Sequence, residues 1–341
     1  MTADGVGRRM PGIFVYEHLS GGPLSPAEAT DPAVAEWRPQ GTAMRDALVA
    51  DLARLPGLAV TCAVNDTADE ALVARLATGP GTSVGTAWAV PGETAVDFVR
   101  RQAAAHALAW VVAPESDGLL ATLQAAVPPA RWLGCDAAAL ALASSKTATV
   151  AALAARGIAT PLAFAEGGAP GLRWIAKPDD GAGAVDARVF AHEAAAREGA
   201  ATLIAAGRRM CVEPWVPGEA LSITVLAGEG WVQALAFNRQ HIEVSAEGWL
   251  AFHGVEPNAL AAAGDPRVVR LHLLALEVAR AVPGLFGLVC IDLVWHPERG
   301  PVVIEVNPRL TSAYVGLSAR LGRNLADEVL RAHAAAVSRH G

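Results

Sequence analysis

The sequence predicts an α/β fold with more than one domain, and three observations support this. Short apolar runs of strand length alternate with longer segments whose apolar residues recur at helical spacing, as in parallel sheets with crossover helices. The chain has 341 residues, which is long enough for two or three domains. Hydrophobic residues make up 52% of it and aromatic residues only 5%, a composition typical of a globular protein.

The alternation is clearest in the first third, where we expect an N-terminal α/β domain over residues 12–133. The stretch 12–18 is a strand candidate that leads into a glycine turn at 20–23. The other expected elements are a helix at 40–54, a strand at 58–64, helices at 66–77 and 93–107, and a buried strand at 108–113. Ligands of parallel sheets sit beyond the carboxyl ends of the strands, so the loops at 20–23 and 113–118 are candidate binding loops.

Two further units are expected, a central lobe over 134–210 and a C-terminal lobe over 211–341. The central lobe begins with a helix over 144–156, which Gly157 ends as a C-cap. Its other expected elements are strands at 173–177 and 184–190 and a helix at 193–206. The C-terminal lobe is expected to contain strands at 210–216, 220–227 and 231–237, a helix at 266–281 and a hairpin over 287–309.

Charge and cysteine usage exclude several classes of function. The net charge is −7 and no basic stripe occurs, so we expect no nucleic-acid partner. The four cysteines lack C-x-x-C spacing, which favours buried thiols over a zinc site or disulfides. Residues 1–11 lack the apolar core of a signal peptide, and no apolar run reaches the ~20 residues of a membrane span. We therefore expect a cytoplasmic protein with small-molecule substrates and no membrane partner.

Lysine is the rarest charged residue, because only Lys146 and Lys177 occur against 25 arginines. A compact ammonium and a planar guanidinium are not interchangeable, so these lysines suggest a task that arginine cannot perform. Lys146 starts an apolar helix after Ser145, and Lys177 ends a strand before the glycine loop at 179–183. A strand-end cation beside a glycine loop indicates a polyphosphate site. Chance survival of two lysines is the alternative.

The hairpin at 287–309 brings acidic side chains together. We assume a four-residue loop that places His296 opposite Pro301. Asp292 then lies opposite Glu305, and Asn307 shares their face. Opposed like charges are destabilising unless a cation joins them, and oxygen donors suit Mg²⁺, with Mn²⁺ as the alternative ion. A solvated acidic face is the plainer explanation, and a slip of one residue would undo the pairing.

Two other segments are candidates for ligand contact. The stretch 213–219 predicts a strand that runs into a rigid turn with two prolines, whose main-chain groups are available to a planar ligand. Glu219 can reach a sugar hydroxyl, although an inter-domain linker explains the same residues. Arg239 follows the strand at 231–237 and is a candidate anion clamp, although a surface arginine is the commoner case. No Walker A loop or G-x-G-x-x-G motif occurs, so the usual phosphate loops are excluded.

Taken in order, these features resemble the ATP-grasp superfamily of ligases over roughly residues 135–335. Its members pair a helix-borne lysine, a strand-end lysine with a glycine-rich lid, a hinge strand and a late Asp…Glu-x-Asn metal hairpin. Residues 12–130 resemble the Rossmann-like pre-ATP-grasp domain of the same enzymes. Several strings look closer still to the tyramine–L-glutamate ligases of methanofuran biosynthesis. They are VYEH with SGG at 15–22, APESDG at 113–118, NRQ at 238–240 and NPRLTSAY at 307–314.

The resemblance implies a complete site for ATP and metal. Lys146 and Lys177 would contact the phosphates of ATP, and the 179–183 loop would cover them. The residues implied by the resemblance are Asp180, Gly181 and Gly183 of that loop, Glu213, Trp215 and Val216 for adenine, Glu219 for ribose, Asp292, Glu305 and Asn307 for Mg²⁺, and Arg309 with Arg239 for the transferring phosphoryl group.

The implied activity is an ATP-dependent ligase reaction that couples the γ-carboxylate of L-glutamate to tyramine or, in a bacterial relative, to tyrosine. Tyr16 and Tyr314 are the only tyrosines, and either could pack against the aromatic amine. Glu115 could pair with the ammonium group, and structural roles for all three residues are the alternative. Two rivals stay open: another amino-acid ligase of the superfamily (D-Ala–D-Ala type or glutamylating) and a non-catalytic ATP-binding module. Related ligases also imply a homodimer.

Overall fold

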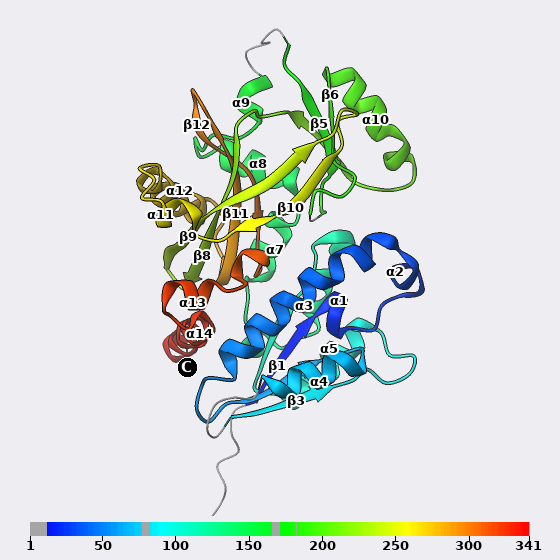
Figure 1. Cartoon of the computed structure of the whole chain (residues 1–341), viewed down its shortest axis with the longest axis vertical. Coiled ribbons are helices and arrows are strands. Elements are labelled where there is room, and N and C mark those ends of the chain that lie inside the picture. Colours follow the sequence, from blue (N-terminus) through cyan, green and yellow to red (C-terminus); the bar gives the residue numbers. More distant parts are fainter. Residues whose placement is uncertain (1–11, 77–81, 166–170, 182, 341) are drawn as a thin grey trace, which may run out of the picture. The chain divides into compact units, whose positions relative to one another are not determined.

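The computed structural model describes residues 12–76, 82–165, 171–181 and 183–340 (Figure 1). The chain divides into two compact units. The N-terminal unit comprises Met1–Val112, Leu123–Leu133 and Asn324–Glu328, and the C-terminal unit comprises Ala113–Thr122, Gly134–Arg323 and Val329–Gly341. Helices and strands mix in both units, which confirms the predicted α/β class. The expected division into three parts at residues 133 and 210 stays a prediction.

The N-terminal unit is built on a parallel sheet of four strands in the order β3-β2-β1-β4. The strands are β1 (Gly12–Glu17), β2 (Ala59–Ala63), β3 (Ser83–Ala87) and β4 (Leu108–Val112). Val15 of β1 lies beside Cys62 of β2 and Trp110 of β4, and all three side chains are buried. The crossover connections that parallel strands require contain α3 (Pro32–Leu52), α4 (Thr67–Arg75) and α5 (Ala95–Ala105).

Two elements of this unit differ from the sequence prediction. Helix α3 begins at Pro32 rather than near residue 40, and Pro39 lies inside it. Proline usually interrupts a helix, which is why the sequence indicates the later start. Asp31 caps the actual start by accepting a hydrogen bond from the N–H of Ala33 at 2.9 Å. Strand β3 was not predicted at all, because most of its residues are not buried and it lacks a strong apolar pattern.

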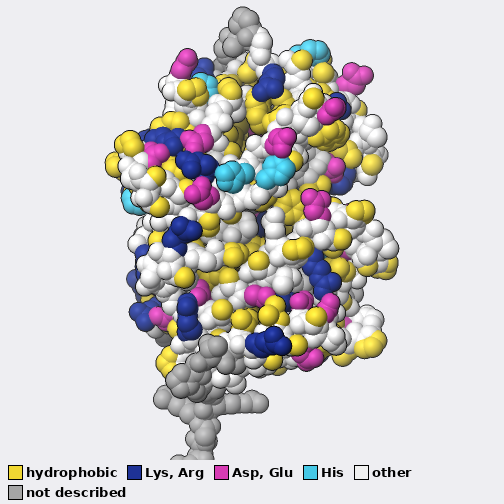
Figure 2. Space-filling view, in the orientation of Figure 1, with side chains coloured by type: hydrophobic (Ala, Val, Ile, Leu, Met, Phe, Trp, Pro, Cys, Tyr) yellow, Lys and Arg dark blue, Asp and Glu magenta, His cyan; other side chains and the backbone are white. Residues whose placement is uncertain are grey.

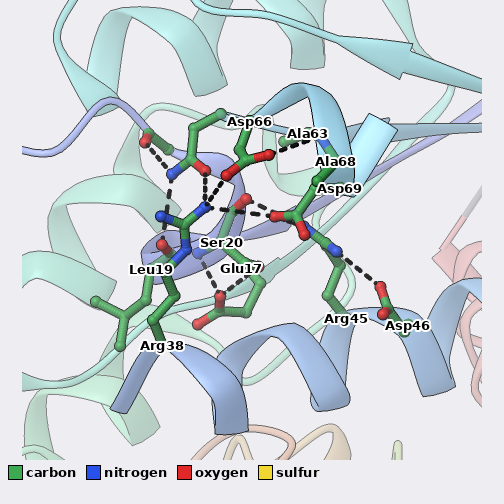
Figure 3. Close-up of polar contacts among 12 residues, drawn as sticks. Glu17, Leu19, Ser20, Arg38, Arg45, Asp46, Ala63, Asp66, Ala68 and Asp69 are labelled. Carbon is green, nitrogen blue, oxygen red and sulfur yellow. Dashed lines mark hydrogen bonds and ion pairs between the residues drawn. The ribbon is translucent and has the colours of Figure 1, made fainter. Parts of the chain in front are cut away.

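A polar network ties the loop after β1 to the loop after β2 (Figure 3). Arg45 of α3 has no exposed surface, and its Nη1 donates to the carbonyl of Ser20 and to Asp69, each at 3.0 Å. The buried carboxylate of Glu17 accepts hydrogen bonds from the N–H and hydroxyl of Ser20 at 2.8 and 2.7 Å. Arg38 extends the network to the loop after β2, because its Nη2 donates a hydrogen bond to Oδ1 of Asn65 at 2.9 Å. Charged groups from α3 therefore hold the glycine turn in place.

The C-terminal unit contains two antiparallel sheets, in the orders β6-β5-β7 and β10-β9-β8-β11-β12. The smaller sheet consists of β5 (Trp174–Pro178), β6 (Arg188–Phe190) and β7 (Met210–Pro214). The larger sheet consists of β8 (Glu219–Gly228), β9 (Trp231–Val244), β10 (Leu250–Glu256), β11 (Gly287–His296) and β12 (Gly300–Asn307). Antiparallel pairing of β11 with β12 confirms the predicted hairpin.

Helices cover the sheets of this unit on several sides. Helix α10 (Glu193–Ala205) packs on the smaller sheet, and α12 (Val268–Ala281) packs on β8 and β9. The other helices among the described residues of both units are α1 (His18–Gly21), α2 (Pro26–Thr30), α6 (Leu119–Ala125), α7 (Ala137–Ala143), α8 (Lys146–Ala154), α9 (Leu162–Ala165), α11 (Ala259–Ala262), α13 (Leu317–Leu321) and α14 (Leu325–His340), with 3-10 turns at Ser116–Gly118, Pro129–Arg131 and Ser312–Tyr314.

Two strands of the C-terminal unit have other bounds than predicted. The strand expected at 184–190 is reduced to β6, because Ala184 and Asp186 have positive φ angles of 64° and 54° that extended backbone does not allow. The strand expected at 231–237 continues as β9 to Val244 and pairs with β10, which was not predicted. The extension matters for the site, because it contains Gln240.

The cysteines are buried thiols, as predicted. Burial raises the pKa of Cys62 and of Cys135 to about 12, so both stay protonated and unreactive near neutral pH. Within the described residues no single helix is long and apolar enough to cross a membrane, although α7 and α8 together, bent by 98°, meet the criteria of length and composition.

Gly41 of α3 generates a test of the network around Glu17. A Cβ added at Gly41 would lie 2.5 Å from Oε2 of Glu17. Alanine normally stabilises a helix interior by up to ~1 kcal/mol over glycine. We expect Gly41→Ala to reduce the free energy of unfolding by about 1–3 kcal/mol instead, because the carboxylate is buried and cannot retreat. Urea unfolding followed by circular dichroism measures the change.

Gly85→Ala in β3 is the matched control, since its added Cβ would meet nothing within 4 Å. An unchanged unfolding midpoint for Gly41→Ala, or an equal loss in the control, would contradict the close packing of Glu17 against α3.

Candidate active site

The two acids of the hairpin lie directly opposite each other, as the sequence predicts. Asp292 on β11 pairs with Glu305 on β12, and Cys290 pairs with Asn307. The side chains of Asp292, Glu305 and Asn307 share one face of the sheet, where Nδ2 of Asn307 lies 3.0 Å from Oδ2 of Asp292. The hairpin therefore concentrates two carboxylates and one amide at a single point.

The predicted position of the hairpin loop is wrong, and a bulge compensates for it. His296 lies opposite Gly300 rather than opposite Pro301. The register shifts after Asp292, where β12 carries one extra residue, Ile304. A β-bulge inserts such a residue into one strand only. The loop shifts the pairing by one residue and the bulge shifts it back, so that Asp292 still lies opposite Glu305.

Asp292 is partly buried among polar partners. Its two oxygens accept hydrogen bonds from Asn307 Nδ2 and from Gln240 Nε2, each at 3.0 Å. Burial, followed by the negative charge of Glu305, raises the pKa of Asp292 to about 7. A raised pKa means that the surroundings do not fully balance a second negative charge at this point.

Glu305 is the acid that both lysines approach. Its Oε2 lies 3.0 Å from Nζ of Lys146. Burial acts to raise the pKa of Glu305, but the positive charges of Lys146 and then Lys177 outweigh burial and lower it. The two acids therefore differ: the lysines hold Glu305 ionised, while a second negative charge, on Asp292, is disfavoured.

The donor set fits a hard divalent cation. Among the described residues, no group of three or more His, Cys, Asp and Glu side chains is arranged to hold a metal ion. The predicted set needs Asn307 as its third member, and its amide would have to turn to offer Oδ1 in place of Nδ2. Mg²⁺ commonly takes only one or two protein carboxylates and completes its shell with water and phosphate oxygens. Asp292, Glu305 and Asn307 remain the proposed ligands.

Lys146 is positioned by the start of α8. Ser145 caps this helix by accepting a hydrogen bond from the N–H of Ala148 at 3.1 Å, as is usual for a serine N-cap. The N–H of Lys146 donates to the carbonyl of Asp179 at 2.9 Å. Its Nζ reaches the carbonyl of Gly181 at 2.5 Å as well as Glu305. Lys146 therefore joins the helix, the glycine loop and the acidic hairpin.

The first part of the predicted covering loop is anchored. Asp179 accepts hydrogen bonds from the hydroxyl of Ser145 at 2.7 Å and the N–H of Thr147 at 2.8 Å. Asp180 accepts from Nη2 of Arg209 at 2.9 Å and from the N–H of Asp117 at 3.0 Å. These bonds fasten the loop before the glycines. Ala182 lies outside the described residues, and Gly183 has a φ of 72°, which favours glycine.

Lys177 forms an ion pair with Glu213, a residue for which the sequence predicts only a main-chain contact with adenine. Its Nζ lies 2.6 Å from Oε1 of Glu213, and both side chains are buried. Burial opposes the charged form, but the Glu213 carboxylate outweighs it and raises the pKa of Lys177. The side chain of Glu213 was missed because the strand pairing of β5 with β7, which brings the two residues close, cannot be derived from either strand alone.

The hinge segment has fewer available main-chain groups than predicted. The N–H of Trp215 donates to the carbonyl of Arg173 at 2.9 Å, and the Trp215 ring lies against that guanidinium, 5.7 Å from ring centroid to Cζ. Val216 is buried in a cluster with Phe164 and Val302. A contact with adenine is thus left to the remaining main-chain groups of the segment.

Glu219 and Arg239 lie on the opposite face of the larger sheet from the acid pair. Arg239 pairs with Leu221, whereas Asp292 pairs with Ser222, and neighbouring strand positions face opposite ways. Arg239 Nε donates to Oε1 of Glu219 at 2.8 Å. The structure therefore does not bring Arg239 to Arg309, and the predicted role of Arg239 as a catalytic arginine is not carried forward.

Glu219 is held by two guanidinium groups rather than left open. Nη1 of Arg267 donates a hydrogen bond to Oε2 of Glu219 at 2.5 Å. Nothing in the sequence had indicated Arg267 as a partner of Glu219. Burial acts to raise the pKa of Glu219, but Arg267 and Arg239 lower it. The carboxylate is one-third exposed, at 34%, but it lies on the same far face as Arg239, so the structure does not bring it to the acid pair.

Arg309 forms an ion pair with Glu115, which lies 194 residues earlier in the sequence. Nε and Nη2 of Arg309 donate to the two oxygens of Glu115 at 2.9 and 3.0 Å, a bidentate pair. Glu115 is buried, so it is not free to pair with an ammonium group as predicted. A small cleft is lined by Glu115, Lys146, Asp180, Gly181, Glu305 and Asn307. Five of the residues predicted for phosphate and metal thus surround one space, while Lys177 and Asp292 are not among its lining residues.

The two tyrosines lie in the core. Tyr16 has no exposed surface, and its hydroxyl lies 2.9 Å from Nδ1 of His18. Tyr314 is 2% exposed. A buried ring cannot pack against a substrate, so the structure gives neither residue the predicted role. Sequence reasoning missed Gln240 and Arg209 instead, and strand alternation along 238–240 was the signal that could have indicated Gln240.

The raised pKa of Asp292 generates a test of the metal site. Ionisation of Asp292 costs stability as pH rises from about 4, the value of an unfolded Asp, to about 7. In protein freed of metal, Asp292→Asn should therefore raise the thermal unfolding midpoint at about pH 8, and the difference should vanish near pH 4. Millimolar Mg²⁺ should raise the midpoint of the original protein more than that of the variant.

Glu243→Gln serves as the control, because this carboxylate is 69% exposed on β9 and outside the site. The metal assignment fails if Asp292→Asn lowers the midpoint without metal at high pH, or if Mg²⁺ shifts all three proteins equally.

Comparisons with known proteins agree with this geometry. The family model described as "ATP-grasp domain" matches residues 143–313, and the one described as "pre ATP-grasp 3 domain" matches residues 59–140. A search of the curated proteins finds no significant match. A solved protein assigned to the ATP-grasp superfamily from Archaeoglobus fulgidus is 20% identical with a TM-score of 0.64, over 94% of this chain and 88% of that chain.

Two solved ligases resemble the chain in fold. VanG D-Ala:D-Ser ligase from Enterococcus faecalis is 14% identical with a TM-score of 0.61, over 95% of this chain and 99% of that one. L-amino acid ligase from Bacillus licheniformis is 14% identical with a TM-score of 0.57, over 95% and 74%. Identities this low establish the fold alone. The ATP-grasp match, however, spans half of the chain and contains both lysines and the acidic hairpin, and the chain belongs to the ATP-grasp family.

Proposed function

We propose that the protein is an ATP-dependent carboxylate–amine ligase that joins the γ-carboxylate of L-glutamate to the amine of tyramine or tyrosine. The convergence of Lys146, Lys177 and Arg309, each paired with a buried or partly buried acid, at the acidic hairpin carries the proposal. Enzymes that form C–N bonds are among its structural neighbours. The arrangement contains no obvious nucleophile and suits phosphoryl transfer, which depends on positioning and charge stabilisation.

The reaction has two steps. A γ-carboxylate oxygen of glutamate attacks the γ-phosphorus of ATP, and the bond to the leaving ADP oxygen breaks. The amine nitrogen then attacks the carbonyl carbon of the acyl phosphate, the C–N bond forms, and phosphate leaves as the amine loses a proton. The acyl phosphate must be shielded from water, because hydrolysis would waste ATP.

Each residue of the site has a proposed task. Lys146 and Lys177 neutralise phosphate oxygens from two different elements, and Arg309 orients the transferring phosphoryl group. Asp292, Glu305 and Asn307 would hold Mg²⁺, or Mn²⁺, which supplies further charge neutralisation. Main-chain groups at 213–216 would contact adenine, and the loop at 179–183 would cover the phosphates. Glu219, which shares the far face of the sheet with Arg239, is not assigned to the ribose.

The proposed amine rests on sequence strings rather than on contacts. The strings at 15–22, 113–118 and 307–314 resemble tyramine–L-glutamate ligases, which act in methanofuran biosynthesis, a branch of one-carbon metabolism. In the structure the tyrosines of these strings are buried and Glu115 is engaged by Arg309. The alanine- and arginine-rich composition resembles that of bacterial proteins, which makes tyrosine the second acceptor to test. The reaction would take place in the cytoplasm on small-molecule substrates.

A ligase that joins other amino acids is the second candidate. It would use the same nucleotide residues, and D-Ala:D-Ser and L-amino acid ligases share the fold. Residues 12–133 would then hold a different first substrate, while the lobes at 134–210 and 211–341 keep their roles in ATP binding.

Lys177 offers a test of the phosphate site. Lys177→Arg keeps the charge but replaces a compact ammonium, 2.6 Å from Glu213, by a planar fork that has no room in this buried position. We expect kcat/KM for ATP to fall by about 10- to 100-fold. Steady-state ADP release measures it, with Arg197→Lys, exposed on α10, as the control. Full activity of Lys177→Arg would contradict the inference that this position requires an ammonium group.

An acceptor screen tests the reaction itself. The protein is incubated with ATP, Mg²⁺ and glutamate together with tyramine, tyrosine, alanine or glutamate, and a further sample contains D-alanine alone. We expect ADP release that depends on the aromatic amine and a product with the mass of its γ-glutamyl amide. Amide formation only with alanine or D-alanine would establish the second candidate. ATP binding without any ADP release would indicate a non-catalytic module.

A further inference from the structure

Helix α12 carries apolar residues on two sides. One side is buried against β8 and β9 and consists of Leu271, Leu274, Ala275 and Val278. On the other side Val269, Leu273 and Leu276 are 71%, 51% and 38% exposed. Their spacing of four and three residues lines them up as one stripe along the helix. Figure 1 shows α12 beside β9, with the sheet on one side of it only.

This stripe differs from the other exposed apolar side chains. Leu72 on α4, Ile204 on α10 and Val337 on α14, for example, occur singly on their helices. Single exposed apolar residues are normal, whereas a continuous apolar stripe usually marks a contact surface. None of the residues of the candidate active site lies on α12, so the stripe needs its own explanation.

Two opposite charges border the stripe on one edge. Arg270 and Glu277 are 43% and 40% exposed, and the guanidinium donates to both carboxylate oxygens at 3.1 Å. Seven residues amount to nearly two turns, so both side chains lie on the same side of the helix, about 10 Å apart along the axis. One end of the edge is therefore basic and the other acidic.

We propose that α12 is the contact surface of a two-fold symmetric homodimer in which it packs antiparallel against α12 of a second copy. A two-fold interface is self-complementary, because residue i contacts residue j and residue j contacts residue i. With the axis between Leu273 and Leu274, Arg270 of each copy faces Glu277 of the other, while the apolar stripes meet. The two intrachain ion pairs, one in each copy, are exchanged for two interchain pairs.

Charge complementarity selects a second copy over another partner. An acidic helix would satisfy Arg270 and repel Glu277, and a basic helix would do the reverse. Only a partner with the opposite order of charges satisfies both, and an antiparallel copy of α12 has that order. One helix pair falls short of the roughly 800 Å² per partner of a standard interface, so we expect a dissociation constant in the micromolar range.

Sedimentation velocity of the full chain over about 1–100 μM tests the proposal. We expect reversible dimerisation, and Leu273→Glu should raise the dissociation constant by more than ~10-fold. Ile204→Glu on α10, an equally exposed apolar residue at 53%, is the matched control and should leave the constant unchanged. Circular dichroism verifies that each variant is folded.

A charge exchange tests the antiparallel register, with side chains that are too exposed to affect folding. Arg270→Glu and Glu277→Arg should each raise the dissociation constant about 3- to 10-fold, because like charges then face each other. The double variant R270E/E277R should return it to within ~3-fold of the original, because both interchain pairs re-form. A monomer at every concentration, an unaffected dimer in Leu273→Glu, or a double variant no tighter than the single ones would overturn the proposal.

Discussion

The arrangement of the candidate site depends on the charge of one partly buried carboxylate, Glu305. Lys146 contacts it from the start of α8, and the charge of Lys177 acts on it from β5. Removal of one partner from a buried ion pair typically costs about 3–5 kcal/mol, because the other charge is left uncompensated. Three separate elements are therefore held together by charge. Two compact ammonium groups can approach one carboxylate where two planar guanidinium forks would crowd each other, which gives the choice of lysine a physical reason.

Lys146, Lys177 and Arg309 each form an ion pair with a different carboxylate. Lys177 is paired with Glu213, and Arg309 forms a bidentate pair with Glu115. A buried charge without a partner would be costly, so the cations can be held in advance only together with acids. A polyphosphate that entered the site would therefore exchange or share these partners rather than meet unpaired charges. A second negative charge on Asp292, whose pKa is raised to about 7, would be balanced by a divalent cation that enters with the phosphates.

The sequence predicts those parts of the site that follow from a single helix or a single hairpin. The N-cap of Lys146 and the opposition of Asp292 and Glu305 need only local rules of capping and strand alternation. Pairings that depend on the packing of distant segments could not be predicted, since nothing in either strand of the Lys177–Glu213 pair or in either loop of the Arg309–Glu115 pair indicates the partner. The position of Arg239 was misjudged for a smaller reason. The strand was expected to end at residue 237, and a strand that continues through 240 turns Arg239 away from the acids and turns Gln240 toward them.

Lysine and tyrosine, the two residue types to which ligand contacts were assigned partly because they are rare, differ in the cost of burial. Both residue types occur twice in the chain, and both were assigned to ligands. An ammonium group at the end of a strand can be buried only beside a compensating charge, so Lys177 requires a charged environment. A tyrosine is buried readily once its hydroxyl has one partner, and His18 supplies that partner for Tyr16 at 2.9 Å. A residue in a motif therefore indicates a ligand-binding site only when burying that residue in the protein core would be costly. Lysine meets this condition, and tyrosine does not.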